Sequence, residues 1–299
     1  MHCPLSTGRE VFFFDSEIVM DNPVAALDAE AQQLLAQRTD DEAPMIRLLG
    51  TVDVLNTRGK MPVSPNTGKE SPGTAARCIS LLAYLAMSPG ATTEQYNEAF
   101  WPGTQPSGAK GAQNRNKLAN LTRDYLGQDE DGTMLFPHAR NERYSLDERV
   151  MCDWTIFTKL IGNNVYTVSL PRLIAALKLV RGAPFEGIRP KNYLWNIELH
   201  TEMIELITEA AHELVGRAMA MKNPKIARLG ATVGRTVDPA NEQAWRDALN
   251  AEYIAKNRNA VQEIADKLQD YLGAYGDDDE PADETQELIN QLREVGYVA

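Results

Sequence analysis

The sequence lacks a long hydrophobic run and has few cysteines. None of its apolar stretches approaches the roughly 18 residues that a membrane-spanning helix needs, and EVFFFDSEIVM (residues 10–20) is too short and too acidic for a signal peptide. We interpret that stretch as a buried strand. The cysteines are Cys3, Cys78 and Cys152, an odd number at scattered positions without a CxxC pair. The sequence therefore predicts no disulfide framework and no metal knuckle, and it indicates a reducing cytoplasm.

Motifs that carry catalytic or cofactor chemistry are also missing. AHELV around His212 begins like a zinc-protease helix, but Gly216 stands where the second imidazole ligand belongs. NTGKES ends like a phosphate loop, but it has no leading glycine, and Glu70 replaces the hydroxyl that binds Mg²⁺. The histidines are widely separated in the sequence: His2, His138, His200 and His212. We therefore expect no enzyme activity, no metal site and no cofactor.

Basic residues are outnumbered, and the imbalance is uneven along the chain. The 42 acidic and 30 basic residues give a net charge of −12. Residues 1–44 contain 2 basic and 9 acidic side chains, residues 45–150 contain 12 and 11, and residues 151–299 contain 16 and 22. A dedicated DNA-binding domain is usually clearly basic, because phosphate neutralisation supplies most of the non-specific affinity. The near-neutral charge of residues 45–150 is compatible with DNA binding but does not favour it.

The segment 45–150 has the order of elements of a winged helix. MIRLLGTVDVLNTRGKMPV alternates like a strand, turns at Asn56–Gly59 and resumes as a second strand. A helix at Thr74–Met87 and a second helix over 91–101, with Thr92 or Thr93 as its cap, come next. The remaining expected elements are a third helix and two short strands that flank a polar loop: Gly111–Gly127, Met134–Phe136 and Arg143–Leu146.

The third of these helices is amphipathic, and its polar side suits DNA. One side carries apolar residues at helical spacing: Leu118, Leu121, Thr122 and Tyr125. The other side carries amide and basic groups of the kind that a DNA-reading helix presents to base edges: Gln113, Asn116, Lys117, Asn120 and Arg123. Asp124 lies on that outer side as well. The pattern leaves open whether the helix reads DNA or only keeps the shape of one that does.

Residues 151–299 are almost entirely helical by pattern. Short connections such as KNRNA and VDPAN separate antiparallel pairs, which suggests a tetratricopeptide-like array. The expected helices are Trp154–Ile161, Leu170–Val180, Leu194–Met221, Pro224–Val237, Glu242–Lys256, Val261–Tyr275 and Glu284–Val295. The fold class is thus mainly α with a small β component.

Residues 1–44 form an acidic segment to which we assign no domain. We expect a strand over Val11–Met20 and a helix over Pro23–Arg38, with Asn22 as its cap. TDDEAP then ends the helix and is typical of a linker.

Several stretches in a fixed order resemble a known family. IRLLGTVDV, ARCISLLAYLAMSPGATTEQYNEAFWPG, RNKLANLTRDYLG, RYSLDERVMCDWTIF and LVRGAPFEG follow one another as in the bacterial transcriptional activator architecture of the SARP regulators of actinobacteria. The resemblance covers roughly residues 45–298. In detail it is greatest to a branch in which these two domains end large actinobacterial proteins that also carry LysM or membrane-spanning segments. Residues 1–44 would then be the remnant of such a larger protein.

The resemblance implies a winged helix-turn-helix domain at 45–150 and a TPR-like activator domain at 151–299. The recognition helix of the family falls on Asn114–Leu126, and LTRD stands here where members commonly carry a basic LRR run. The implied DNA contacts are Gln113, Arg115, Asn116, Lys117, Asn120 and Arg123, together with Arg140 and Arg143 in the hairpin loop. Further phosphate contacts could come from Lys60, Lys69, Arg77 and Lys110 if these residues share a face.

Two hypotheses follow. In the first, the protein is a transcription regulator that binds duplex DNA through the winged helix, and the helical domain serves oligomerisation or partner contacts. In the second, it is a protein–protein interaction or signalling module that keeps the same scaffold without reading DNA, which suits the net charge of −12 and Asp124. Neither hypothesis includes a membrane contact within this chain.

Overall fold

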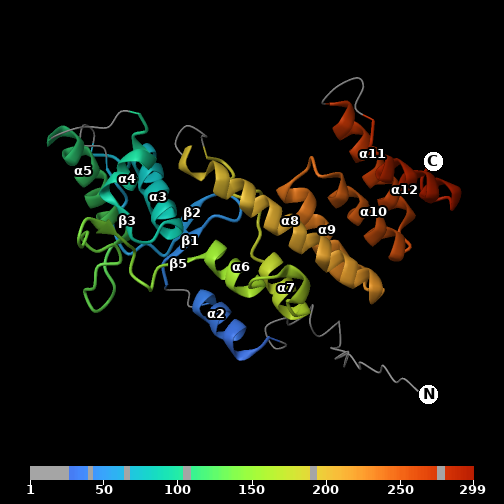
Figure 1. Cartoon of the computed structure of the whole chain (residues 1–299), viewed down its shortest axis with the longest axis horizontal. Helices are drawn as coiled ribbons and strands as arrows, with labels where there is room; N and C mark the ends of the chain where they lie inside the picture. Colours follow the sequence, from blue (N-terminus) through green and yellow to red (C-terminus); the bar gives the residue numbers. More distant parts are fainter. Residues whose placement is uncertain (1–26, 40–42, 64–67, 104–108, 189–193, 275–279) are drawn as a thin grey trace, which may run out of the picture.

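The computed structural model describes residues 27–39, 43–63, 68–103, 109–188, 194–274 and 280–299. Figure 1 shows the helices of the middle segment at one end of the molecule and the C-terminal helices at the other, with the longest helix between them. The expected strand Val11–Met20, and Asn22 with Pro23, lie outside the described residues.

The first described helix packs on the C-terminal part of the chain. α2 (Ala29–Thr39) begins later than expected, because Leu27 and Asp28 are not helical and the Asp28 carboxylate accepts the N–H of Ala31 at 3.0 Å. Arg172 binds the same carboxylate, with 2.6 Å between Nε and Oδ2. Leu27, Ala31 and Leu35 are buried in the common core. Residues 27–39 are therefore attached to the helical domain.

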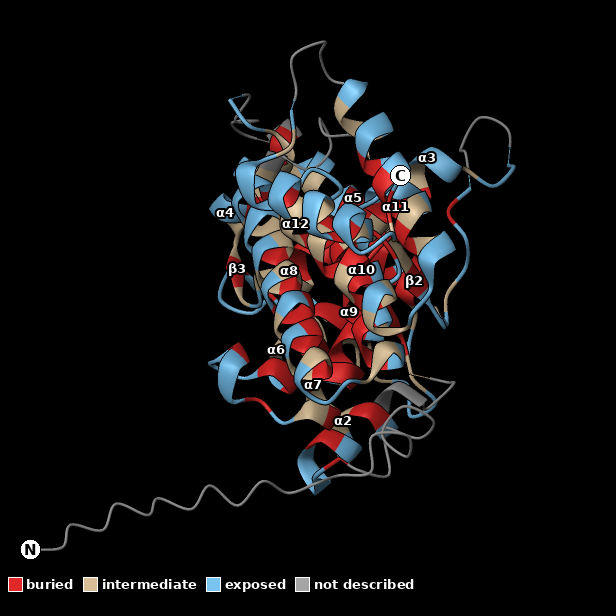
Figure 2. Ribbon diagram, turned by 90° about the vertical axis from the view of Figure 1, so that its right-hand side faces the viewer, coloured by how far each residue is buried: buried red, intermediate tan, exposed pale blue. Residues whose placement is uncertain are grey.

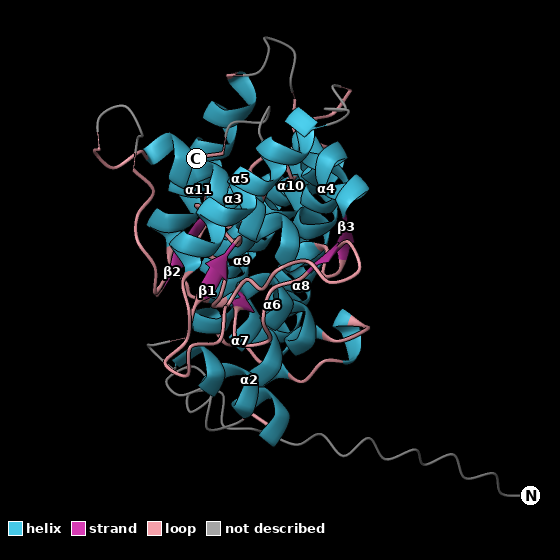
Figure 3. Cartoon of the chain, turned by 90° about the vertical axis from the view of Figure 1, so that its left-hand side faces the viewer, coloured by secondary structure: helices cyan, strands magenta, loops and turns pink. Residues whose placement is uncertain are grey.

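A small three-stranded sheet, in the order β2-β1-β5, opens the winged-helix part (Figure 3). β1 (Met45–Arg47) pairs antiparallel with β2 (Asp53–Leu55) and parallel with β5 (Met151–Cys152). The prediction of one continuous strand up to residue 55 is wrong, because the chain already turns at residues 48–52. The expected second strand is reduced to a single bridge between Val63 and Glu70.

Three helices follow, as predicted: α3 (Pro72–Met87), α4 (Thr93–Phe100) and α5 (Ala109–Leu126). Thr92 caps α4, because its hydroxyl accepts the N–H of Gln95 at 3.2 Å while the Gln95 side chain accepts the N–H of Thr92 at 2.8 Å. The prediction of a strand at Met134–Phe136 is wrong. β4 (Arg143–Tyr144) pairs instead with β3 (Ala91–Thr92), and Leu135 and Phe136 turn into the core.

The C-terminal part is an array of antiparallel helices, as expected. Its elements are α6 (Asp153–Ile161), α7 (Leu170–Leu177), α8 (Ile197–Ala220), α9 (Pro224–Val237), α10 (Glu242–Ile254), α11 (Arg258–Gly273) and α12 (Asp283–Glu294), with 3-10 turns at Val165–Thr167 and Leu194–Asn196. Gly230 lets α8 and α9 approach closely, because a Cβ there would lie 2.6 Å from the carbonyl oxygen of Ala211. Figure 2 shows the buried residues of α8, α9 and α10 turned toward one another.

The turn between β1 and β2 joins the two parts of the chain. The carboxylate of Asp153, at the start of α6, accepts the N–H groups of Leu48 at 2.7 Å and Leu49 at 3.1 Å. Two backbone hydrogen bonds close the turn from the other side. The N–H of Arg181 donates to the carbonyl of Leu49 at 2.8 Å, and the N–H of Phe185 donates to that of Leu48 at 3.0 Å. Since these partners pull residues 48–50 out of the sheet, they explain why the strand ends early. One continuous core then includes both parts.

Candidate nucleic-acid interface

α5 has one buried and one open side. Its apolar residues pack against α3, and Leu118, Ala119, Tyr125 and Leu126 are buried there. Four of the predicted contacts are exposed on the other side: Gln113, Asn116, Lys117 and Asn120. Since α5 lies at the end of the molecule remote from α11 and α12, the helical array does not cover this side (Figure 1). A DNA duplex could therefore reach it.

Arg123 does not belong to the open side, and the prediction that it faces DNA is wrong. The residue is 8% exposed, and its Nε donates to the carbonyl of Phe136 at 3.1 Å. Nη1 donates to Oδ1 of Asn120 at 2.8 Å. Burial lowers the pKa of the guanidinium group below its ordinary value. Ala119 and Leu126, four residues before and three after, are both buried, and this spacing is the sequence signal that places Arg123 at the edge of the buried side.

Arg115 is half-buried and connects two helices. Its Nη1 donates to Oδ1 of Asn97 on α4 at 3.1 Å, and its buried Nε finds no hydrogen-bond acceptor among the described residues. This contact sets α4 against the first half of α5, which is the pairing that a helix-turn-helix requires. Sequence reasoning missed Asn97. Arg115 is therefore only partly available to a ligand.

The hairpin that contains Arg140 and Arg143 forms a tight wing tip. Asn141 and Glu142 have left-handed φ angles of 50° and 60°, as the two central residues of a type I′ turn do. Arg140 and Arg143 exchange both backbone hydrogen bonds, at 3.1 and 3.0 Å, so they face each other directly. Both side chains are exposed, although Nη1 of Arg143 also donates to the carbonyl of Gly90 at 3.0 Å. Two like charges opposite one another are unfavourable unless an anion lies between or beside them.

Acidic groups surround this surface. Asp124 is exposed on α5, Glu142 occupies the wing tip, and Glu94 and Glu98 are exposed on α4. Of the further phosphate contacts that the sequence suggests, Lys60, Lys69 and Arg77 are exposed. The side chain of Lys110 lies outside the described residues. Arg77 lies over the ring of Trp101, with 5.8 Å to the ring centroid. The positive charge of the candidate interface is thus confined to a few side chains.

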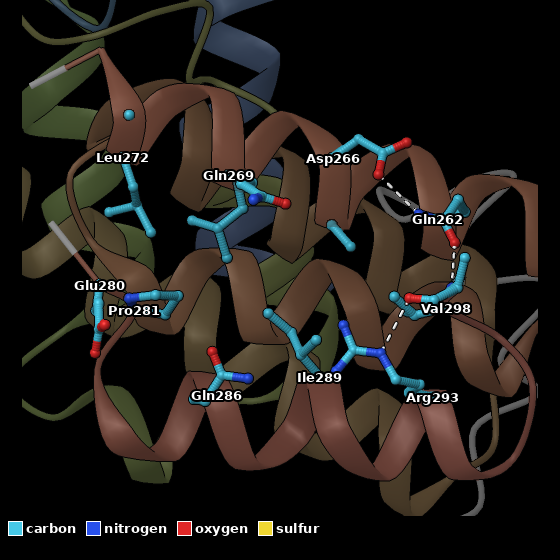
Figure 4. Close-up of a pocket in the computed structure, with 14 residues that line it drawn as sticks. Gln262, Asp266, Gln269, Leu272, Glu280, Pro281, Gln286, Ile289, Arg293 and Val298 are labelled. Carbon is cyan, nitrogen blue, oxygen red and sulfur yellow. Dashed lines mark hydrogen bonds between the residues drawn. The ribbon is translucent and has the colours of Figure 1, made fainter. Parts of the chain in front are cut away.

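A hollow of about 500 Å³ lies at the other end of the molecule, between α11 and α12 (Figure 4). Its floor is apolar, with Leu268, Leu272 and Ile289. The polar groups drawn at one end bond to one another: Gln262 donates to Asp266 at 2.7 Å, and Arg293 donates to the carbonyl of Ala299 at 3.0 Å. That end of the hollow therefore offers a ligand few polar groups that lack a hydrogen-bond partner.

No group of three or more His, Cys, Asp or Glu side chains is placed to hold a metal ion in the part of the chain that the structure describes. None of the helices that the structure describes is long and apolar enough to cross a membrane.

The fold is a winged helix-turn-helix domain followed by an all-α, TPR-like helical domain. No protein-family model matches the sequence, and neither does any curated protein. Among solved structures, the chain is similar to EmbR of Mycobacterium tuberculosis, determined in complex with a low-affinity phosphopeptide, with a TM-score of 0.54. The sequences are 16% identical, and the match covers 85% of this chain and 65% of EmbR. At this identity the similarity shows a common fold alone, and the chain matches only part of the length of EmbR.

Proposed function

We propose that the protein is a transcription regulator that binds duplex DNA with α5 in the major groove. The observation that supports this most is the open side of α5, where Gln113, Asn116 and Asn120 follow one another at helical spacing beside Lys117. The resemblance of the sequence to the SARP regulators implies the same role. A DNA-binding role is consistent with the cytoplasm that the cysteine pattern indicates.

Each exposed side chain has a role in this proposal. The amides of Gln113, Asn116 and Asn120 face base edges, since amides pair with adenine in the major groove. Because Arg123 already binds Oδ1 of Asn120, the Nδ2 group of that amide is the part left for a base. Lys117 contacts phosphate on the same groove.

The wing contributes a second phosphate contact. Arg123 donates to the carbonyl of Pro137 at 3.4 Å, so the chain that enters the wing is tied to the C-terminal half of α5. Arg140 and Arg143 then lie beside the recognition helix rather than beneath the helical array, and they contact the adjacent DNA backbone.

The helical domain provides self-association or partner contacts, as the resemblance to the SARP regulators implies. The LysM-linked branch remains a proposal for the origin of residues 1–44.

Fluorescence anisotropy with random-sequence duplex DNA at about 50 mM salt tests the proposal, and we expect micromolar binding. Lys117→Ala should weaken it severalfold, because one phosphate contact is lost. Lys267→Ala is the matched control, since this exposed lysine on α11 pairs with Glu263 at the other end of the molecule. Absence of binding below about 100 μM DNA would refute the proposal.

An interaction module without DNA binding is the second candidate. Burial of Arg123 favours it, because Lys117 is then the one fully exposed cation among the described side chains of α5, and Asp124 offsets its charge. The same titration distinguishes the two candidates. A protein that binds no DNA but binds a protein partner through the helical domain is the outcome that this second candidate predicts.

A further inference from the structure

A row of glutamates follows the open side of α8. The row consists of four exposed residues: Glu198, Glu202, Glu205 and Glu209. Their spacing of four, three and four residues places them on one side of the helix. Like charges at this spacing repel one another, and no ion pair joins Glu202, Glu205 or Glu209 to a cation among the described residues. Glu209 instead accepts the hydroxyl of Tyr166, which raises the pKa of that tyrosine.

Glu205 and Glu209 line a groove of about 360 Å³ that lies over the contact between α8 and α10. Small residues form its floor: Ala211, Gly234 and Ala244. A Cβ at position 234 would lie 3.2 Å from that of Ala244, so glycine helps to keep the groove deep. No lysine or arginine is among the residues that line it. The groove therefore combines apolar depth with a negatively charged wall.

The wall formed by α8 also presents an imidazole, that of His212, which Asp247 on the opposite wall, α10, holds in place. Nδ1 of His212 lies 2.9 Å from Oδ2 of Asp247, which is 5% exposed. Gln243 donates to Oδ1 of the same carboxylate at 3.0 Å. Arg246, behind this wall, donates through Nη1 to Oγ1 of Thr285 and through Nη2 to Oε1 of Gln243, each at 2.8 Å. Because Asp247 fixes Nδ1, the half-exposed Nε2 edge of His212 is the part that a ligand meets.

We propose that this groove binds an extended, lysine- or arginine-rich segment of a partner protein. Charge complementarity selects the occupant, because the walls offer carboxylate acceptors and contain no lysine or arginine. The row from residue 198 to residue 209 is about 16 Å long, the length of about five extended residues. A second copy of the chain, with its net charge of −12, and a nucleic acid would both be repelled. The proposal rests on the partner-binding role of the helical domain and is independent of DNA binding.

The geometry also gives the interaction a pH dependence. Four charged or titratable groups face His212: Glu209 and Glu213 on its own helix, and Arg246 and Asp247 on α10. The hydrogen bond to Asp247 raises the pKa of His212, so the imidazolium form persists to a higher pH than in a free histidine. An imidazolium in the wall repels a basic segment. Binding should therefore strengthen as the pH rises from about 6 to about 8.

Fluorescence anisotropy with labelled hexalysine at about 50 mM salt tests the proposal on the full chain. We expect Glu205→Gln/Glu209→Gln to weaken binding about tenfold. Glu284→Gln/Glu287→Gln on α12 is the matched control, because these residues are exposed and their replacement changes the net charge equally. The control should bind within about twofold of the wild type. Far-ultraviolet circular dichroism verifies that both variants fold.

Two results would overturn the proposal. Equal weakening in both double variants would show attraction to the overall negative charge rather than to the groove, and absence of hexalysine binding by the wild type would show no site. The pH dependence is tested separately. His212→Gln should remove the increase in affinity for hexalysine between pH 6 and 8. An unchanged increase would contradict the role of the imidazole. DNA binding should be the same in all these variants, so failure here is distinguishable from failure of the regulator proposal.

Discussion

The guanidinium group of Arg123 lies over the ring of Phe136, with 4.7 Å between Cζ and the ring centroid. The same arginine donates to the carbonyl of Phe136 at 3.1 Å and to Asn120 at 2.8 Å. It therefore joins α5 to the chain that enters the wing. A residue that the sequence suggests as a DNA contact instead connects α5 to the wing.

Replacement of Arg123 should change the position of the wing relative to α5 rather than the positive charge that the surface offers to DNA. We expect Arg123→Ala to lower the free energy of unfolding by about 1–3 kcal/mol, because the buried carbonyl of Phe136 loses its donor. DNA affinity should fall, but the slope of log K against log salt should stay the same. Lys117→Ala should instead reduce that slope by about one unit. Urea denaturation and salt titrations measure the two effects, and a reduced slope in Arg123→Ala would show that the arginine contacts phosphate after all.

The helices were predictable because their signals are local. Apolar spacing placed α3, α5 and all seven helices of the C-terminal array within a few residues, and the bounds of α9 coincide with Pro224–Val237. Thr92 was one of two predicted caps of α4, and the capping box confirms it. The exposure of Gln113, Asn116 and Asn120 follows from the same periodicity.

The errors come from contacts between residues far apart in the sequence. The first strand ends at Arg47 because Asp153, more than a hundred residues later, binds the N–H groups of Leu48 and Leu49. Arg123 is buried because Phe136 folds back on it. No pattern in the sequence could identify Asp247, 35 residues away, as the partner of His212.

Asp153 should be important for the junction of the two domains. The carboxylate is 4% exposed, and it accepts two backbone N–H groups and lies 3.6 Å from Arg181. We expect Asp153→Ala to lower the free energy of unfolding by about 3 kcal/mol, since buried donors lose their acceptor. Asp153→Asn should cost less, because its amide oxygen still accepts one of these bonds. Denaturant unfolding measures both, and equal stability of Asp153→Ala and the wild type would contradict the role of this carboxylate.

Gly59 should tolerate no side chain. A Cβ there would lie 1.8 Å from the carbonyl oxygen of Asp124, where residues 58–60 bind the end of α5. Gly59→Ala should therefore cost about 2–3 kcal/mol, as overpacking does. Gly73→Ala is the control: that position in α3 has no neighbour within 4 Å, and the change should stabilise by up to about 1 kcal/mol. Thermal or urea unfolding compares the pair, and equal effects of the two substitutions would show that the close approach at Gly59 is absent.

The pairing of His212 with Asp247 should make stability depend on pH. The hydrogen bond to Asp247 raises the folded-state pKa of His212 above its unfolded value near 6.5. The stabilisation is therefore fully present below about pH 6.5 and is lost as the pH rises through the folded-state pKa. The wild type should exceed His212→Gln in stability by most at about pH 5.5–6, and by less at pH 8–9. Urea titrations across this range measure the difference, which should not grow toward alkaline pH.

The salt dependence of DNA binding tests the central claim most directly. If Lys117, Arg140 and Arg143 each contact a phosphate, the plot of log K against log salt for random duplex DNA should have a slope of about −3. The variant in which all three become alanine should lose nearly all of that slope, while its folding is unchanged because the three side chains are exposed. A slope near zero in the wild type, or the same slope in the variant, would contradict the winged helix as a DNA-binding surface.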